Sequence, residues 1–149
     1  MLFGAALLVA AADQGVKALV VRALPASASI PVLPGVLSIT HVQNPGVAFG
    51  LLSGISPVAS ALVALTLFFL VLYNRGRWLV TRAAGGGFAL MAGGACGNLL
   101  DRARLGHVVD YLDLHVWPVF NLADVAIVVG AGLLLLVTAR EGRQAQSRR

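Results

Sequence analysis

Four segments of this chain are long and apolar enough to cross a lipid bilayer as helices, since a spanning helix needs about 20 mostly apolar residues. Only 11% of the 149 residues are charged and 58% are hydrophobic, whereas a soluble domain carries about 25% charged residues. We therefore predict an all-α membrane protein with a single domain over residues 1–149. The expected helices cover about residues 2–23, 56–73, 83–100 and 122–139, and a polar, disordered tail follows over 140–149.

The arginines lie beside the apolar segments rather than on a separate basic face. The loop after the second segment holds Arg75, Arg77 and Arg82, and the C-terminal tail holds four more arginines. Basic loops stay in the cytoplasm, so both termini are expected to face inward and the other two loops outward. The same placement excludes nucleic acid as a partner, despite a net charge of +5. Because the first segment lacks a basic lead-in, we expect a retained helix rather than a cleaved signal peptide.

The first outer loop contains short extended pieces. Residues 30–33 and 36–42 are rich in β-branched side chains and are separated by Pro34 and Gly35. This pattern predicts a β-hairpin or a small sheet that lies on the membrane surface. The third apolar segment is rich in glycine, which lets helix backbones approach closely, so we expect that helix to lie centrally in the bundle.

Polar residues gather at one depth, near the outer ends of the apolar segments. Asp13 and Lys17 are four residues apart, in the favourable order for an ion pair on one helix face. Asn98, Asp101 and Arg102 share a face of the third helix. Asn121 and Asp124 share the start of the fourth helix, where asparagine is a good N-cap. Ionisable groups inside a membrane are costly, so this cluster is a candidate functional site.

The acidic residues favour an aspartic dyad, because the chain shows no serine, cysteine or histidine arrangement typical of a covalent nucleophile. In such a dyad one carboxylate takes a proton from water while the other, protonated, polarises the scissile carbonyl. His41, His107 and His115 lack metal-ligand spacing, so neither a metal nor a cofactor is expected. Spacing alone leaves open which two acids form the dyad, among these four: Asp101, Asp110, Asp113 and Asp124.

Five motifs follow one another along the chain. They are Asp-Gln-Gly-Val-Lys at 13–17, Asn-Pro-Gly-Val-Ala-Phe-Gly at 44–50, Gly-Gly-Ala-Cys-Gly-Asn-Leu-Leu-Asp-Arg at 93–102, Gly-His-Val-Val-Asp-Tyr-Leu at 106–112 and Phe-Asn-Leu-Ala-Asp at 120–124. In this order they resemble the motifs of the lipoprotein signal peptidase (signal peptidase II) family. The match covers nearly the whole chain, and the ordered set is far more specific than any one of its members.

The resemblance implies a function and a set of site residues. It implies removal of signal peptides from diacylglyceryl-modified prolipoproteins, N-terminal to the lipidated cysteine, by a monomer in the bacterial inner membrane. It also implies that the outer loop forms a cradle, with an interfacial helix or flap near residues 101–111. The implied catalytic pair is Asp110 and Asp124, and the implied substrate-binding and supporting residues are Asn44, Gly97, Asn98, Arg102, Asn121, Asp13 and Lys17.

Other interpretations compete with these assignments. Asp13 and Lys17 suit a structural ion pair between helices better than direct contact with substrate. Asp101 suits an anchor of the helix end at the lipid headgroups, and Asp113 suits a solvated loop residue. A small proton-coupled transporter that uses Asp13 and Lys17 is the main alternative function, and a non-catalytic scaffold subunit is the third.

Overall fold

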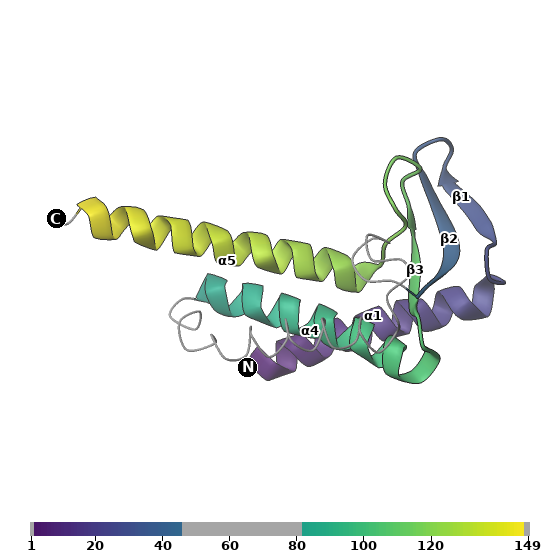
Figure 1. Ribbon diagram of the computed structural model, residues 1–149, viewed down its shortest axis with the longest axis horizontal. Helices are drawn as coiled ribbons and strands as arrows, with labels where there is room; N and C mark the ends of the chain where they lie inside the picture. Colours follow the sequence, from purple (N-terminus) through teal and green to yellow (C-terminus); the bar gives the residue numbers. More distant parts are fainter. Residues whose placement is uncertain (1, 46–81, 148–149) are drawn as a thin grey trace.

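The computed structural model describes residues 2–45 and 82–147, so the span expected at 56–73 lies outside the described residues. Figure 1 shows the helices extending away from a small sheet, with both chain ends on the side opposite the sheet. The helices are α1 (Leu2–Ala23), α4 (Arg82–Leu105) and α5 (Leu122–Ser147), and the strands are β1 (Ser29–Leu33), β2 (Leu37–Asn44) and β3 (Val108–Asp113).

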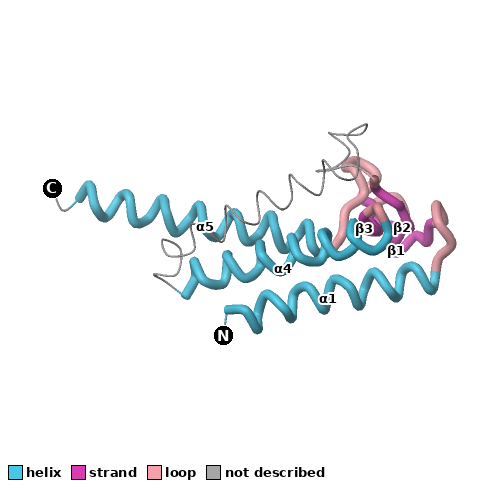
Figure 2. Tube along the Cα trace, turned by 60° about the horizontal axis from the view of Figure 1, so that its bottom comes forward, coloured by secondary structure: helices cyan, strands magenta, loops and turns pink. Residues whose placement is uncertain are grey.

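Helix α4 lies between α1 and α5, as the tube in Figure 2 shows. It contacts both neighbours extensively, whereas α1 and α5 contact each other little. Two adjacent glycines explain the close approach: a Cβ on Gly93 would collide with Ala6 and Val9 of α1, and one on Gly94 with the Ala123 carbonyl of α5. The prediction that the glycine-rich helix is central is therefore confirmed with respect to α1 and α5.

The helices present large apolar side chains outward, as a lipid solvent requires. In α1, Phe3 and Leu8 are each 72% exposed, and Leu135 of α5 is equally exposed. Within the described part of the chain, α1 and α4 are long and apolar enough to span a membrane, and α5 is apolar over Leu122–Val137. Patches of this kind are unusual on a soluble monomer.

The three strands form one antiparallel sheet in the order β1-β2-β3. The hairpin expected in the first outer loop is confirmed as β1 and β2, and Gly35 turns it with φ of +74°. Strand β3 comes from the segment between α4 and α5 and was not predicted. It pairs with β2 in a register that sets Val42 opposite Asp110 and Asn44 opposite Val108. The sheet thus joins the segment after α1 to the segment before α5.

Three expectations about outer and terminal segments are wrong. In place of an interfacial helix or flap near 101–111, α4 continues to Leu105 and β3 begins at Val108, because pairing with β2 satisfies the backbone of that segment. Asp113 ends this strand instead of lying in a loop. The tail is helical to Ser147 rather than disordered, since the polar residues after Arg140 continue α5 without a Gly-Pro break.

The sheet rests on the end of the helical bundle. Tyr111 of β3 packs with Val20 and Leu24 at the end of α1, and Ile39 and Leu122 join this cluster. These contacts fix β3 above the first turn of α5. They therefore determine the position of Asp110 in β3 relative to Asp124 in α5.

Candidate active site

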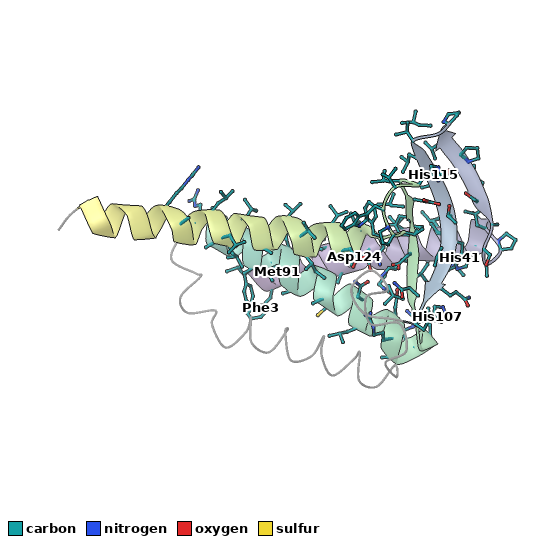
Figure 3. All side chains as sticks on the ribbon, turned by 45° about the horizontal axis from the view of Figure 1, so that its top comes forward. Phe3, His41, Met91, His107, His115 and Asp124 are labelled. Carbon is teal, nitrogen blue, oxygen red and sulfur yellow. The ribbon has the colours of Figure 1, made fainter. Side chains whose placement is uncertain are left out.

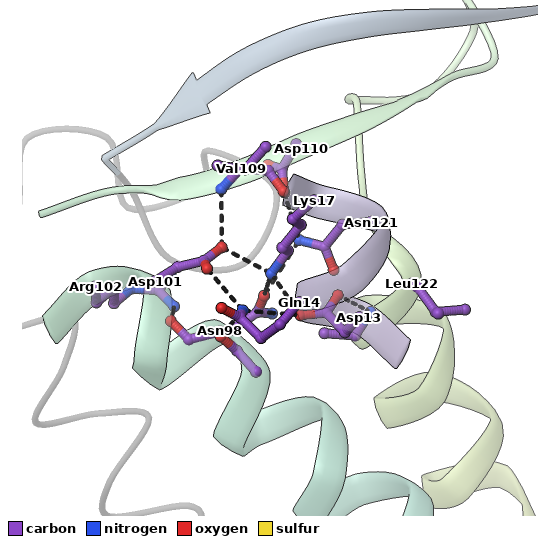
Figure 4. A network of polar contacts seen from close by, with 12 residues as sticks. Asp13, Gln14, Lys17, Asn98, Asp101, Arg102, Val109, Asp110, Asn121 and Leu122 are labelled. Carbon is purple, nitrogen blue, oxygen red and sulfur yellow. Dashed lines mark hydrogen bonds and ion pairs between the residues drawn. The ribbon is translucent and has the colours of Figure 1, made fainter. Parts of the chain in front are cut away.

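Buried polar side chains gather where the helices meet the sheet (Figure 4). Asp13 and Asn121 are completely buried, and Asp110 is 2% exposed. Buried polar groups require hydrogen-bond partners, and here the partners are one another. The structure places all nine residues proposed from the sequence in or beside this cluster: Asp13, Lys17, Asn44, Gly97, Asn98, Arg102, Asp110, Asn121 and Asp124.

Asp110 projects from β3 and accepts one hydrogen bond on each carboxyl oxygen. Asn121 Nδ2 donates to Oδ1 at 2.6 Å, and Asn44 Nδ2 donates to Oδ2 at 2.8 Å. Both donors are neutral amides. These two amides therefore orient the Asp110 carboxyl on two sides.

Asp124 is held at the start of α5 by its helix cap. The Asp124 backbone N–H donates to Asn121 Oδ1 at 2.9 Å, and the Asn121 N–H donates back to Asp124 Oδ2 at 3.2 Å. This reciprocal pair is the geometry of a capping box. Asn98 Nδ2 donates to the other oxygen, Oδ1, at 2.9 Å. The prediction that Asn121 caps this helix is confirmed.

Asn121 connects the two acids directly. Its side-chain amide donates to Asp110, and its side-chain oxygen and backbone N–H bind Asp124. The same Nδ2 also lies 3.2 Å from Asn98 Oδ1. The residue that begins α5 thereby sets the mutual position of both carboxyl groups.

Burial raises the pKa of Asp110 from its usual 3.8 to about 7. Removal from water disfavours the charged form, and this is the main cause. The negative charge of Asp124 raises the pKa further, whereas hydrogen bonds from Asn44 and Asn121 lower it. A carboxyl with such a pKa exchanges a proton near neutral pH. This property suits general acid–base chemistry.

Lys17 forms a second, ionic centre below the two acids. Its ammonium contacts Asp13 Oδ2 at 2.9 Å, Asp101 Oδ2 at 2.8 Å and Asn98 Oδ1 at 2.8 Å. An ammonium has three protons, and each has an acceptor here. The expected ion pair of Asp13 with Lys17 is thus present, with Asp101 added to it.

Asp13 links the first helix to the last. Its Oδ1 accepts the N–H of Ala123 at 3.0 Å, one of the donors that a helix start leaves without an intrahelical partner. Its Oδ2 lies against Gly97, where an added Cβ would collide with the carboxyl group. Gly97 is therefore required for the close approach of α4 to Asp13.

Arg102 lies one turn beyond Asn98 on α4. Its Nη1 donates to the Asn98 carbonyl oxygen at 3.3 Å. Its guanidinium is close enough to Asp101, Asp110 and Asp124 for charge interaction. Arg102 thus supplies positive charge to the outer side of the site.

Sequence reasoning missed several contributors, and it misplaced Asp101. Asp101 is 2% exposed and accepts hydrogen bonds from Val109 N at 3.1 Å and from Gln14 Nε2 at 2.8 Å. A headgroup anchor is therefore the wrong interpretation. Gln14 also donates to the Gly97 carbonyl at 3.1 Å. The Tyr111 hydroxyl accepts the N–H of Leu122 at 3.2 Å. From the sequence, Tyr111 was only the residue that follows Asp110 in its motif.

A cavity of about 390 Å³ opens beside Asp124, between α5 and the loop that precedes it. A larger cavity of about 480 Å³ lies between α1 and α4, and its lining consists of apolar residues and Cys96. The larger cavity contains neither candidate acid. The cavity beside Asp124 is therefore the better candidate for binding a substrate next to the two acids.

Comparisons with known proteins identify the family of the chain. A family model described as signal peptidase (SPase) II matches residues 5–140. The lipoprotein signal peptidase of Halothermothrix orenii is 45% identical over 91% of this chain and 93% of its own length, and that of Moorella thermoacetica is 43% identical over 93% and 95%.

Two solved structures also share the fold. Both are described as bacterial membrane enzymes. One has a TM-score of 0.82 at 26% identity and covers 93% of this chain and 87% of that chain, and the other has a TM-score of 0.74 at 27% identity and covers 90% and 89%. With matches in both sequence and fold over most of its length, the chain belongs to the signal peptidase II family.

Proposed function

We propose that this protein is an aspartic endopeptidase of the membrane that removes signal peptides from diacylglyceryl-modified bacterial prolipoproteins. Membership in the signal peptidase II family and the relatives named lipoprotein signal peptidase support this activity. The bond cleaved is the one N-terminal to the lipidated cysteine. The lipid anchor holds that bond at the membrane interface, so little further entropy is lost in locating it.

Asp110 and Asp124 are the proposed catalytic pair, and the observation that carries the proposal is Asn121. This one residue hydrogen-bonds to both carboxyl groups in a buried site. Two buried acids in such a site resist losing both protons, so the pair holds one. The pKa of Asp110 is raised to about 7, so Asp110 can carry this proton near neutral pH. In the proposed reaction it does so, and Asp124 is the ionised partner.

The proposed reaction needs only these two groups and water. Ionised Asp124 accepts a proton from a water molecule, and the water oxygen adds to the scissile carbonyl carbon. Protonated Asp110 donates a hydrogen bond to the carbonyl oxygen, whose charge increases in the transition state. Collapse of the tetrahedral intermediate breaks the C–N bond, and the leaving amine takes a proton from the pair. No covalent enzyme intermediate, metal or cofactor takes part.

The remaining polar residues position the pair. Asn44, Asn98 and Asn121 orient the carboxyl groups. Arg102, close enough to Asp110 and Asp124 for charge interaction, is assigned to binding the substrate backbone. The Asp13–Lys17 pair, with Gly97 against it, supports the site from below.

We place the protein in the bacterial inner membrane as a monomer with four spans and two cytoplasmic termini. The arginines before α4 and those in the C-terminal tail support this orientation. Figure 1 shows the start of α4 and both chain ends on the side opposite the sheet. Membrane lipids then surround the exposed apolar faces of α1 and α5. The catalytic pair lies at the outer face, where a lipidated substrate arrives.

Transport through Asp13 and Lys17 is the weaker candidate. A carrier must expose its ionisable group to both sides in turn. Lys17 is 3% exposed, and its three protons are all bound within the cluster. This saturation favours a fixed structural role.

The decisive experiment is cleavage of a synthetic diacylglyceryl prolipopeptide by the purified protein in detergent. Asp110→Asn and Asp124→Asn are each expected to lower kcat by about 10³-fold or more, because either change removes one half of the proton transfer. The fold should persist, as judged by circular dichroism. If either variant retains cleavage within tenfold of the original protein, the catalytic pair is wrong.

Glu141→Gln is the matched control, since it makes the same acid-to-amide change 17 residues further along α5, about 25 Å away. Its rate should be unchanged. EDTA should also leave the rate unchanged. Loss of activity in EDTA that zinc restores would contradict the metal-free reaction.

A further inference from the structure

The loop between β3 and α5 joins the two proposed catalytic acids, since Asp110 lies before it and Asp124 after it. Its base is closed by backbone pairing of Leu112 with Phe120, with N···O distances of 2.7 and 3.1 Å. Residues 113–119 therefore form a closed excursion away from this base. Whatever fixes the excursion also fixes the wall of the site beside Asp124.

His115 ties this excursion to the sheet (Figure 3). Its Nε2 lies 3.2 Å from Ser38 Oγ, and its Nδ1 lies 3.5 Å from Asp113 Oδ1. Its backbone N–H donates to the same Asp113 oxygen at 2.9 Å. We refer to Ser38, Asp113 and His115 as the latch.

The latch holds its members in unusual states. His115 has φ of +62°, a left-handed conformation that is strained for a residue with a side chain and persists only where the surroundings hold it. The pKa of Asp113 is lowered, chiefly by the hydrogen bond from the His115 N–H and then by that from Thr40 Oγ1. Asp113 is therefore ionised at neutral pH and keeps its acceptor oxygens for the latch.

The excursion forms one wall of the 390 Å³ cavity beside Asp124, and α5 forms the other. Apart from Asp124, every lining residue is apolar. On α5 the apolar surface extends away from the acid toward the bilayer, where Val128 is 60% exposed. The residues that line the cavity are Leu114, Trp117, Phe120, Asp124, Val125, Val128 and Val129.

We propose that the latch sets the width of this cavity and that the cavity receives an acyl chain of the substrate. His115 is then a positioning residue for the lipid side of the reaction. The proposal rests on the proposed function, because only that function places a diacylglyceryl group next to the scissile bond. An acyl chain fits because it is wholly apolar and can pass from the cavity along α5 into the surrounding lipid.

Two variants of His115 test the latch. His115→Gly removes the ring while allowing the positive φ, and His115→Gln keeps a side chain that can reach Ser38. We expect His115→Gly to raise KM for a dipalmitoylglyceryl peptide about fivefold with kcat within about twofold, since binding is affected and the acids are not. His115→Gln should restore KM to within about twofold of the original. Val116→Ala, in the same loop at a side chain 90% exposed, is the control that should change neither constant.

Acyl length distinguishes the lipid from the peptide as occupant of the cavity. The KM increase in His115→Gly should be smaller for a dioctanoylglyceryl peptide than for the dipalmitoyl one. An equal increase for both would overturn the acyl assignment. A fall in kcat without a change in KM would overturn the positioning role, as would unchanged constants.

Absence of cleavage by the original protein would reject the proposed function but would leave the latch untested by kinetics. A binding measurement tests the latch in that case. The chain has two tryptophans, so in a Trp78→Phe background the fluorescence reports on Trp117, which lines the cavity. A peptide with brominated acyl chains should quench it, with an apparent Kd about fivefold weaker after His115→Gly. Absence of quenching in the original protein would contradict acyl binding in this cavity.

Discussion

Two pairs of aspartates lie within one buried cluster, and their hydrogen-bond partners differ in kind. Asp13 and Asp101 both contact the ammonium of Lys17, at 2.9 and 2.8 Å. Asp110 and Asp124 instead accept hydrogen bonds from asparagine amides and a backbone N–H. Within the described residues, the Lys17 ammonium binds the first pair, while uncharged asparagine amides and a backbone N–H donate to the second.

This difference suggests a structural role for the pair at Lys17 and a chemical role for the pair at Asn121. Carboxylates that share a buried ammonium are held in place by short ionic contacts, and breaking such a contact is costly. A buried carboxyl with neutral donors keeps a proton until about pH 7, as Asp110 does. The Lys17 centre therefore fixes the backbone of α1, α4 and β3, and the asparagine centre is free to exchange protons.

The largest expected effect follows removal of the cation. Lys17→Met leaves Asp13 and Asp101 buried without their ammonium, and we expect a loss of about 3–5 kcal/mol in the free energy of unfolding. An SDS titration of the purified protein measures it. Leu19→Met, at an exposed position two residues further along α1, is the control. A loss below about 1 kcal/mol would mean that the ionic centre is not a structural support.

The next effect concerns the residue that connects the acids. Asn121→Ala removes the donor to Asp110 and the cap of α5, and should lower kcat/KM by about 10²-fold. Asn121→Ser keeps a good N-cap but is too short to reach Asp110, so its stability should be near normal and its activity still low. Normal activity in the serine variant would assign Asn121 to capping alone.

A smaller effect is a pH-dependent change in stability at Asp110. Its folded pKa is about 7 and its ordinary value is 3.8, so between pH 4 and 7 the unfolded chain releases this proton first and the folded state loses stability as pH rises. Asparagine does not titrate. Between pH 5 and pH 8, the free energy of unfolding of Asp110→Asn should therefore rise by about 2 kcal/mol relative to that of the original protein. Paired SDS titrations at the two pH values measure it, and an equal stability difference at both would refute the raised pKa.

The smallest effect is expected for the neighbouring acid in the same strand. Asp113→Asn keeps an oxygen that can accept the His115 N–H, so kcat/KM should stay within about threefold of the original. Complete inactivation would show that the wrong acid of β3 was chosen.

The sequence predicted the three described helices and part of the cluster because both depend on local spacing. The ion pair of Asp13 with Lys17 follows from a separation of four residues, and the cap at Asn121 from its place before an apolar run. The choice of Asp110 rather than Asp101 came from family resemblance. Spacing alone left both open.

What escaped prediction depends on contacts between distant segments. Strand β3 exists because β2, more than 60 residues earlier, offers it an edge, as in the pairing of Gln43 with Val109. The burial of Asp101 depends on Lys17 and Gln14 from another helix. No pattern within residues 98–113 encodes either partner.

The contact between Asp13 and the N–H of Ala123 spans 110 positions of the chain. A ribosome makes the first of these residues long before the last, and domains generally form from the N-terminus onward. The Asp13 carboxylate of α1 is therefore made before the Ala123 N–H of α5 that it accepts. A copy truncated before α5 lacks Asp124, the second acid of the proposed catalytic pair, so we expect hydrolysis only after α5 has been made.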